Sequence, residues 1–452
     1  MLGLSLDTPT IKTSPYNNHA GHLKNCYLVF NGDYNEDCAY GSYLNNNKGI
    51  INCSLASYSE YCYDSQNIFK DNRIIGSNHV NESIDCAFLS NSRNCQNCFA
   101  SINLYNKKYY IFNKPYTKEE YENEIKKWDL GSYSQYKEIK RKAEEHWGQY
   151  SPRPRWDDFS NNCTGNYVFQ SKNCHECYEV VGAQDCKFIF SCGNPPIKNS
   201  YDISSWGNNL ESAYECCIVG ENTSGAKFCQ ECGINAYDIE YSKLSTGGSN
   251  HLGCVSIKKG DYCIFNRRYS REEYQKLREK IIDQMKKVVY TDKRGRKYGY
   301  GEFFPVELSP WAYNETIAQK FIPMNKEGIE RLGFKWRIEE SRKSDINKKG
   351  SDLPDHIKDV PDSILNDVIK CESCYGGFRI IKMELDFLRK MNLPISRECP
   401  FCRIDYRLTA WAKNLFLNTR ECSECGEKFD TPFTKNETPK IFCKDCYSKK
   451  FL

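Results

Sequence analysis

Eight cysteines near the C-terminal end of the sequence have a spacing that suits a metal ion. They form four Cys-x-x-Cys pairs, which are Cys371/Cys374, Cys399/Cys402, Cys422/Cys425 and Cys443/Cys446. Two thiolates three residues apart can bind one side of a metal ion, and a second pair completes a tetrahedron. The pairs therefore predict two metal sites with four cysteine ligands each, and we expect zinc in both.

A zinc ion with four thiolate ligands keeps no open position for water or substrate, so both sites predict a structural role. Redox dithiols and iron–sulfur ligation are the alternatives for the same residues. No Cys/His/Asn or Ser/His/Asp set stands out elsewhere, and no catalytic residue is assigned. We therefore expect a protein that is not an enzyme.

Three further Cys-x-x-Cys pairs lie earlier in the chain, at Cys95/Cys98, Cys174/Cys177 and Cys229/Cys232. We expect these thiols to be buried and inert. An additional metal or redox role remains the alternative for Cys174, Cys177, Cys229 and Cys232. A redox role requires a thiol with a low pKa and access to solvent.

A repeat of three residues runs through the first cysteine-rich stretch, from about residue 22 to 106. Every gap between its cysteines is a multiple of three, and the residue before each is usually Asn or Asp. Period three fits neither a helix nor a flat strand. We predict a β-solenoid with small residues inside, Asx turns at its corners and Tyr outside, in a mainly β fold with helices. An irregular, metal-bound fold is the alternative. The cysteines are Cys26, Cys38, Cys53, Cys62, Cys86, Cys95 and Cys98.

The solenoid pattern occurs twice. Residues 109–121 and 262–274 are identical at eight of thirteen positions, and each stretch leads into a capping box, at Thr117 and Ser270. In the second copy the spacing between cysteines shifts from a multiple of three by single residues, which predicts insertions near 194–196 and 245–249. We predict a module with its helix over 1–150, a second over 151–298, a connector with short helices over 299–360 and tandem zinc ribbons over 361–452.

The charges of the chain nearly balance, with 63 Lys and Arg against 59 Asp and Glu among 452 residues. This balance does not indicate nucleic acid, but Lys293, Arg294, Arg296 and Lys297 form a local basic group that could contact phosphates. We saw no export signal and no apolar run that could span a bilayer. With 26 cysteines, these features predict a reducing, cytoplasmic location and no membrane.

The first cysteine site resembles the treble-clef type of zinc ribbon. The likeness rests on the residues between its two pairs, which include Phe378, Glu384, Phe387 and Pro394. The second site, with Gly426 and Phe429 after its first pair, resembles a generic zinc ribbon. These resemblances imply two structural zinc ions and carry no activity.

Most of the chain is also similar to a group of uncharacterised Cys-rich proteins of uncultivated bacteria with small genomes. The likeness rests on the segments 25–28, 32–38, 262–266, 301–305, 313–316 and 353–359. This chain lacks cysteine at Gly41, Ser101 and Tyr110, so any metal bound at those positions in the group would lack these ligands here.

The leading functional prediction is a non-enzymatic, zinc-binding recognition or scaffold protein with a protein partner. Nucleic-acid binding through the ribbons and residues 293–297 is the second hypothesis. An enzyme that acts through thiols or on a polymer is the third. The sequence predicts neither a pathway nor an oligomeric state.

Overall fold

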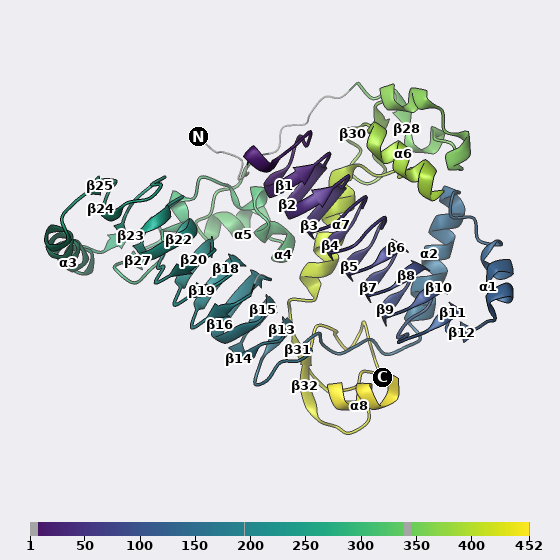
Figure 1. The fold of residues 1–452 in the computed structure, drawn as a ribbon, viewed down its shortest axis with the longest axis horizontal. Coiled ribbons are helices and arrows are strands. Elements are labelled where there is room, and N and C mark those ends of the chain that lie inside the picture. Colours follow the sequence, from purple (N-terminus) through teal and green to yellow (C-terminus); the bar gives the residue numbers. More distant parts are fainter. Residues whose placement is uncertain (1–7, 194, 339–344, 452) are drawn as a thin grey trace.

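The computed structural model describes residues 8–193, 195–338 and 345–451. Its main feature is a pair of β-solenoids, each built from parallel strands (Figure 1). The two solenoids lie at an angle to each other, and helix α7 (Pro400–Lys413) lies between them. The predicted mainly β, solenoid-like architecture is confirmed. No helix within these described ranges is long and apolar enough to cross a membrane.

The first solenoid comprises the strands from β1 to β12. Consecutive rungs pair in parallel at a spacing of 12 residues, as in Tyr27 with Ala39 and Ser54 with Gln66, whereas the last strand, β12, pairs antiparallel with its neighbour β11. Its strands are β1 (Asn18–Lys24), β2 (Tyr27–Glu36), β3 (Ala39–Asn45), β4 (Ser54–Ser57), β5 (Gln66–Phe69), β6 (Asn72–Ile75), β7 (Asn78–Asn81), β8 (Ile84–Ala87), β9 (Ser90–Arg93), β10 (Gln96–Phe99), β11 (Lys108–Ile111) and β12 (Lys114–Pro115).

A left-handed backbone residue at almost every third position closes each rung. Asn25, Leu28, Asn31 and Tyr34 have φ angles of 51°, 52°, 53° and 53°. Each turns the chain, and the next residue points inward, so four triplets complete a rung of 12. Asn and Asp adopt this conformation more easily than other residues that have a side chain, which explains why they precede the cysteines.

Small side chains fill the solenoid interior and also bind its backbone. The hydroxyl of Ser77 donates to the carbonyl of Ile75 at 2.9 Å and accepts the N–H of Leu89 from the next rung at 2.9 Å. The thiol of Cys38, which is 0% exposed, donates to the carbonyl of Glu36 at 3.2 Å. Ser and Cys therefore satisfy backbone groups at the corners, where the strand ladder is interrupted.

The second solenoid comprises the strands from β13 to β25. It begins with 12-residue rungs, such as Val180 with Cys192, lengthens to 13 residues, as in Ile203 with Cys216, and returns to 12 at its end, as in Ser249 with Asp261. Its strands are β13 (Gly165–Phe169), β14 (Lys172–His175), β15 (Cys177–Val181), β16 (Ala183–Cys192), β17 (Ile197–Lys198), β18 (Tyr201–Gly207), β19 (Leu210–Glu211), β20 (Tyr214–Gly220), β21 (Thr223–Ser224), β22 (Gln230–Glu240), β23 (Thr246–Leu252), β24 (Asp261–Ile264) and β25 (Arg267–Arg268).

The extra residue of each 13-residue rung sits at one corner, at 208–209, 221–222 and 234–235, whereas the shifts in cysteine spacing had predicted insertions near 194–196 and 245–249. Two consecutive left-handed residues occupy that corner in successive rungs. The amide of Asn209 donates to Asn222 at 2.6 Å, and Asn222 donates to Asn235 at 3.3 Å. This asparagine ladder aligns the insertions. Of the loop predicted at 194–196, Asn194 lies outside the described residues.

Helices and short sheets complete the chain. The predicted capping boxes at Thr117 and Ser270 are both present. The helices are α1 (Lys118–Ile125), α2 (Tyr133–Trp147), α3 (Arg271–Lys287), α4 (Ala318–Phe321), α5 (Lys326–Arg331), α6 (Lys382–Met391), α7 (Pro400–Lys413) and α8 (Lys444–Phe451). The remaining strands are β26 (Tyr290–Thr291), β27 (Lys297–Tyr298), β28 (Lys348–Lys349), β29 (Ile369–Lys370), β30 (Gly377–Phe378), β31 (Asn418–Glu421) and β32 (Lys428–Thr431).

Substitution of Gly41 tests how closely adjacent rungs pack inside the first solenoid. A Cβ atom added there would lie 2.6 Å from the carbonyl oxygen of Cys53 in the next rung. Gly41→Cys should therefore destabilise the protein by about 1–3 kcal/mol, because the adjoining backbone must move. Ser101→Cys is the matched control at another inward position and should cost less. Urea unfolding monitored by circular dichroism measures both, and equal midpoints would contradict this account.

Candidate metal centres

The first cysteine group is assembled from two short turns. Cys371 follows β29, and Cys399 is the N-cap of α7. The Sγ atoms of Cys371 and Cys402 are 3.9 Å apart, and those of Cys374 and Cys399 are 3.8 Å apart. The backbone N–H of Cys399 donates to the thiol of Cys371 at 3.2 Å. Helix α7 thus begins within the metal-binding group itself.

The second cysteine group joins the hairpin β31–β32 to helix α8. Cys422 follows β31, and Cys443 precedes α8. The Sγ atoms of Cys425 and Cys443 lie 3.7 Å apart, and the N–H of Cys443 donates to the thiol of Cys422 at 3.3 Å. Gly426 has a φ angle of 76°, which closes the first turn of the group.

Both groups fit a single tetrahedral metal ion. Within each group all four Sγ atoms lie within 4.8 Å of one another. Zinc–thiolate bonds of about 2.3 Å place tetrahedral sulfurs roughly 3.8 Å apart, as observed here. Separations of 3.7–3.9 Å exclude disulfides, and the compactness of each group favours one ion over a multi-iron cluster. Each group therefore has the ligand set for one ion.

The local backbone prepares two of these thiols to bind a cation. Burial alone would raise the pKa of Cys371, but N–H groups of Cys374 and Cys399 hold it below its usual value. At Cys422, N–H groups likewise overcome burial and lower the pKa to about 6. In contrast, burial and then the neighbouring thiol of Cys399 raise the pKa of Cys402. Four thiolates repel one another, and a metal cation removes that repulsion.

The cysteines inside the solenoids are placed differently. Cys174, Cys177, Cys229 and Cys232 are all 0% exposed. Hydrogen bonds with the thiols of Cys177 and Cys186 lower the pKa of Cys174, but solvent does not reach it. Among the residues that the structure describes, only the two C-terminal groups bring three or more potential ligands together. A metal or redox role for the four solenoid thiols stays a prediction.

The first metal centre packs against the first solenoid through a buried ion pair. Glu384 of α6 lies 2.8 Å from Arg403 of α7, and both side chains are buried. The hydroxyl of Tyr40 in β3 donates to Glu384 at 2.9 Å. Burial disfavours the charged form of Arg403, but Glu384 raises its pKa. Sequence analysis selected Glu384 but gave no signal for Tyr40, which lies 344 residues away.

Helix α7 connects this centre to both solenoids. Trp411, near its end, is 0% exposed, and its ring contacts Tyr43 of β3 at 5.0 Å and Phe190 of β16 at 5.9 Å between centroids. Phe321 of α4 packs on it at 5.2 Å. The Trp411 indole N–H donates to Glu179 of β15 at 2.6 Å. One side chain therefore fills the joint between the first and second solenoids.

A second contact closes the joint at the segment between the modules. The rings of His79 and Trp156 are stacked at 3.9 Å between centroids, and Trp156 stacks on Tyr167 at 5.1 Å. His79 Nε2 also lies 2.7 Å from the hydroxyl of Tyr167. Burial, followed by the charge of Arg153, lowers the pKa of His79 to about 3, so the imidazole is neutral. The segment that leads into β13 is therefore held against the first solenoid.

The second metal centre packs on the first solenoid and on this segment. Tyr447 of α8 is buried, and its hydroxyl donates to Asn103 at 2.9 Å and accepts from Asn91 at 2.6 Å. Lys444 lies 3.0 Å from Asp157. Helix α8 therefore carries the metal ligand Cys446 and, at the next residue, the side chain that binds the first solenoid.

The basic group predicted to contact nucleic acid forms the turn of the hairpin β26–β27. Buried Asp292 accepts backbone N–H groups of Arg294 and Arg296, each at 2.9 Å, and pairs with the Arg296 guanidinium at 2.6 Å. Lys293 lies on the same turn, and Lys297 begins β27. Figure 1 places this hairpin beside the second solenoid, away from both cysteine groups. The ribbons and the basic turn do not form one surface.

Comparison with known protein families found no family model that matches this chain, and comparison with curated proteins found no significant match. The two cysteine tetrads are compatible with zinc-ribbon-like sites. The similarity to the Cys-rich bacterial group stays a prediction.

Removal of one ligand should remove one metal ion. Cys402→Ser is expected to lower the metal content from about two ions per chain to about one and to destabilise α7, because a three-thiolate site binds zinc weakly. Cys217→Ser, at a partly exposed cysteine outside both groups, is the control and should retain two. Elemental analysis of the purified proteins measures the ratio, and an unchanged content in Cys402→Ser would contradict the assignment.

The joint should respond to pH through Glu179. Burial raises the pKa of this carboxyl to about 8, although the Trp411 N–H opposes the shift. The folded state then binds an extra proton between about pH 4.3, the usual Glu value, and pH 8, so stability falls as pH rises through this window. Glu179→Gln should thus be more stable than wild type by up to about 5 kcal/mol at pH 8, since each pKa unit corresponds to about 1.4 kcal/mol, and should differ little at pH 4.5. Chemical unfolding at both pH values tests the difference.

Proposed function

We propose that this protein is a non-enzymatic recognition scaffold in which two structural zinc ions fix the angle between two β-solenoids. The first zinc would be held by Cys371, Cys374, Cys399 and Cys402. The second would be held by Cys422, Cys425, Cys443 and Cys446. Zinc supplies no reaction here, because four thiolates fill its coordination sphere. Zinc binding would instead stabilise the folded state at the residues where α7 and α8 begin.

The observation that carries this proposal is the course of α7. Two ligands of the first centre, Cys399 and Cys402, lie at its start, and Trp411 lies near its other end between the solenoids. In between, Arg407 donates to the carbonyl of Tyr40 at 3.0 Å and so holds the helix against β3. A metal ion that fixes the start of this helix would therefore also set its position in the joint.

The solenoids suit recognition because their outer side chains repeat at fixed intervals. Parallel rungs are about 4.8 Å apart, so a column of side chains forms a regular, rigid surface. We infer that a partner protein contacts such columns. Nucleic acid is less favoured, because Asp292 already pairs with one of the four cations in the basic turn.

Metal removal should open the joint without unfolding the solenoids. Chelation is expected to increase the radius of gyration measured by small-angle X-ray scattering, while the far-UV circular dichroism of the strands stays largely unchanged. Trp411→Ala should produce a similar opening in the zinc-loaded protein, because it removes the contact with both solenoids. Trp311→Ala, at a tryptophan that is 40% exposed, is the control. Identical scattering with and without metal would refute the structural role proposed here.

Recognition itself is tested by affinity capture at several salt concentrations. The proposal expects retained protein that is lost in Trp411→Ala and kept in Trp311→Ala. Capture of nucleic acid with a steep salt dependence, removed by charge reversal at Arg294, would replace it with the nucleic-acid hypothesis. Capture of neither from native lysate would contradict a recognition role.

A further inference from the structure

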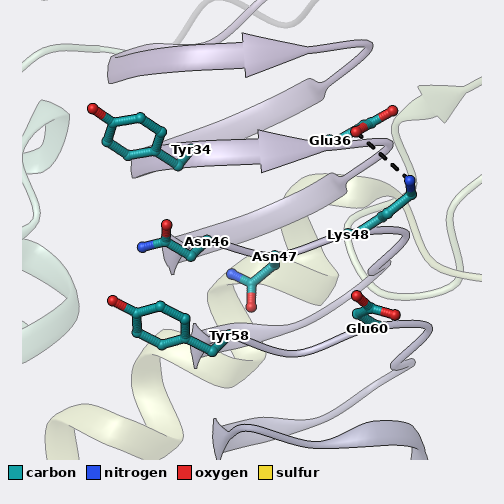
Figure 2. A pocket seen from close by; sticks show the side chains of 7 residues that line it. All are labelled: Tyr34, Glu36, Asn46, Asn47, Lys48, Tyr58 and Glu60. Carbon is teal, nitrogen blue, oxygen red and sulfur yellow. Dashed lines mark ion pairs between the residues drawn. The ribbon is translucent and has the colours of Figure 1, made fainter.

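The outer surface of the first solenoid carries a hollow of about 360 Å³. Tyr34, Asn46 and Tyr58 form one rim, at the same corner of three successive rungs (Figure 2). Glu36, Lys48 and Glu60 form the other rim. Because the register is 12 residues per rung, the two tyrosines are two rungs apart, or about 9.6 Å.

The tyrosine rim offers surfaces that the fold itself leaves uncovered. Tyr34 and Tyr58 are 55% and 56% exposed, so more than half of each residue faces solvent. His22 stacks on Tyr34 at 4.1 Å between centroids, which orders the ring. The exposed amide of Asn46 lies between the two tyrosines and makes no hydrogen bond to another described residue. Two aromatic rings with a polar amide between them are thus presented to solvent.

The opposite rim has alternating charges that nearly cancel. Glu36 pairs with Lys24 at 2.7 Å and with Lys48 at 3.7 Å. Glu60 lies one rung after Lys48. Such a rim offers hydrogen-bond donors and acceptors but no net positive field, so it does not attract the phosphates of a nucleic acid. Its polar groups suit a neutral ligand with many hydroxyl groups.

We propose that this hollow binds an extended, neutral, β-1,4-linked oligosaccharide. The face of Tyr34 that His22 leaves uncovered and one face of Tyr58 contact the C–H faces of two sugars. Their separation of about 9.6 Å is close to that of alternate sugars in an extended β-1,4 chain. Asn46 and the Glu36–Lys48–Glu60 rim bind the hydroxyl groups. This inference goes beyond the scaffold proposal and does not depend on the metal centres.

Isothermal titration calorimetry with soluble hexasaccharides tests this proposal. The probes are β-1,4-linked glucose and β-1,4-linked N-acetylglucosamine hexamers, with a uronic acid oligomer and a single-stranded RNA as comparison ligands. The full-length, metal-loaded protein should bind at least one neutral hexamer saturably and neither anionic ligand. Tyr34→Ala and Tyr58→Ala should each weaken that binding about tenfold.

The control is Tyr16→Ala, which removes a tyrosine that is 71% exposed outside the hollow. Tyr16, Tyr34 and Tyr58 all have left-handed backbones, with φ angles of 60°, 53° and 55°, so the three substitutions impose similar strain. Asn46→Gly keeps the left-handed conformation and removes the amide, and it should also weaken binding. No saturable binding of either neutral hexamer, equal losses in Tyr16→Ala, or preferential RNA binding that requires Tyr34 would overturn the proposal.

Discussion

The left-handed backbone residue at nearly every third position is the constraint on which the rest of the molecule depends. An L-residue in this conformation costs energy, least for Asn, Asp and Gly. The chain accepts that cost because each turn brings the next side chain inward and aligns the strands of neighbouring rungs. The price at the corners is a backbone whose donors need new partners, and inward Ser, Asn and Cys side chains supply them, as Ser77 does for Leu89.

This constraint also explains most of the cysteines. A thiol is small enough for the interior and can donate to a carbonyl, so Cys38 and Ser77 solve the same packing problem. Cys-x-x-Cys spacing in the solenoids then follows from the triplet period, with both thiols pointing inward. In the C-terminal region the same spacing has another cause, because turns there bring four sulfurs within 4.8 Å of one another. Identical sequence motifs thus serve packing in one part and metal binding in the other.

The joint between the solenoids combines contacts that are individually ordinary. Trp411 contributes apolar area and His79 stacks on Trp156, while the buried ion pair of Glu384 and Arg403 holds α6 and α7 against the first solenoid. A buried ion pair is weak evidence for stability, since desolvation offsets much of its attraction. Its value here is geometric, because the pair and the Tyr40 hydroxyl join α6, α7 and β3 at one point. Metal binding at the start of α7 acts on this same orientation.

The sequence alone determined the features that depend on near neighbours: the triplet period, the Asx corners, the helix caps at Thr117 and Ser270, and the ligand spacing of the two cysteine groups. The shifts in cysteine spacing indicated inserted residues, but they gave neither the corner that holds them nor the ladder from Asn209 to Asn235. Only the tertiary structure decided that Trp411 meets Glu179, that Glu384 meets Tyr40, and that Tyr34 and Tyr58 share one rim. The physical reason is range: periodicity records local backbone conformation, whereas these contacts depend on how complete surfaces fit together.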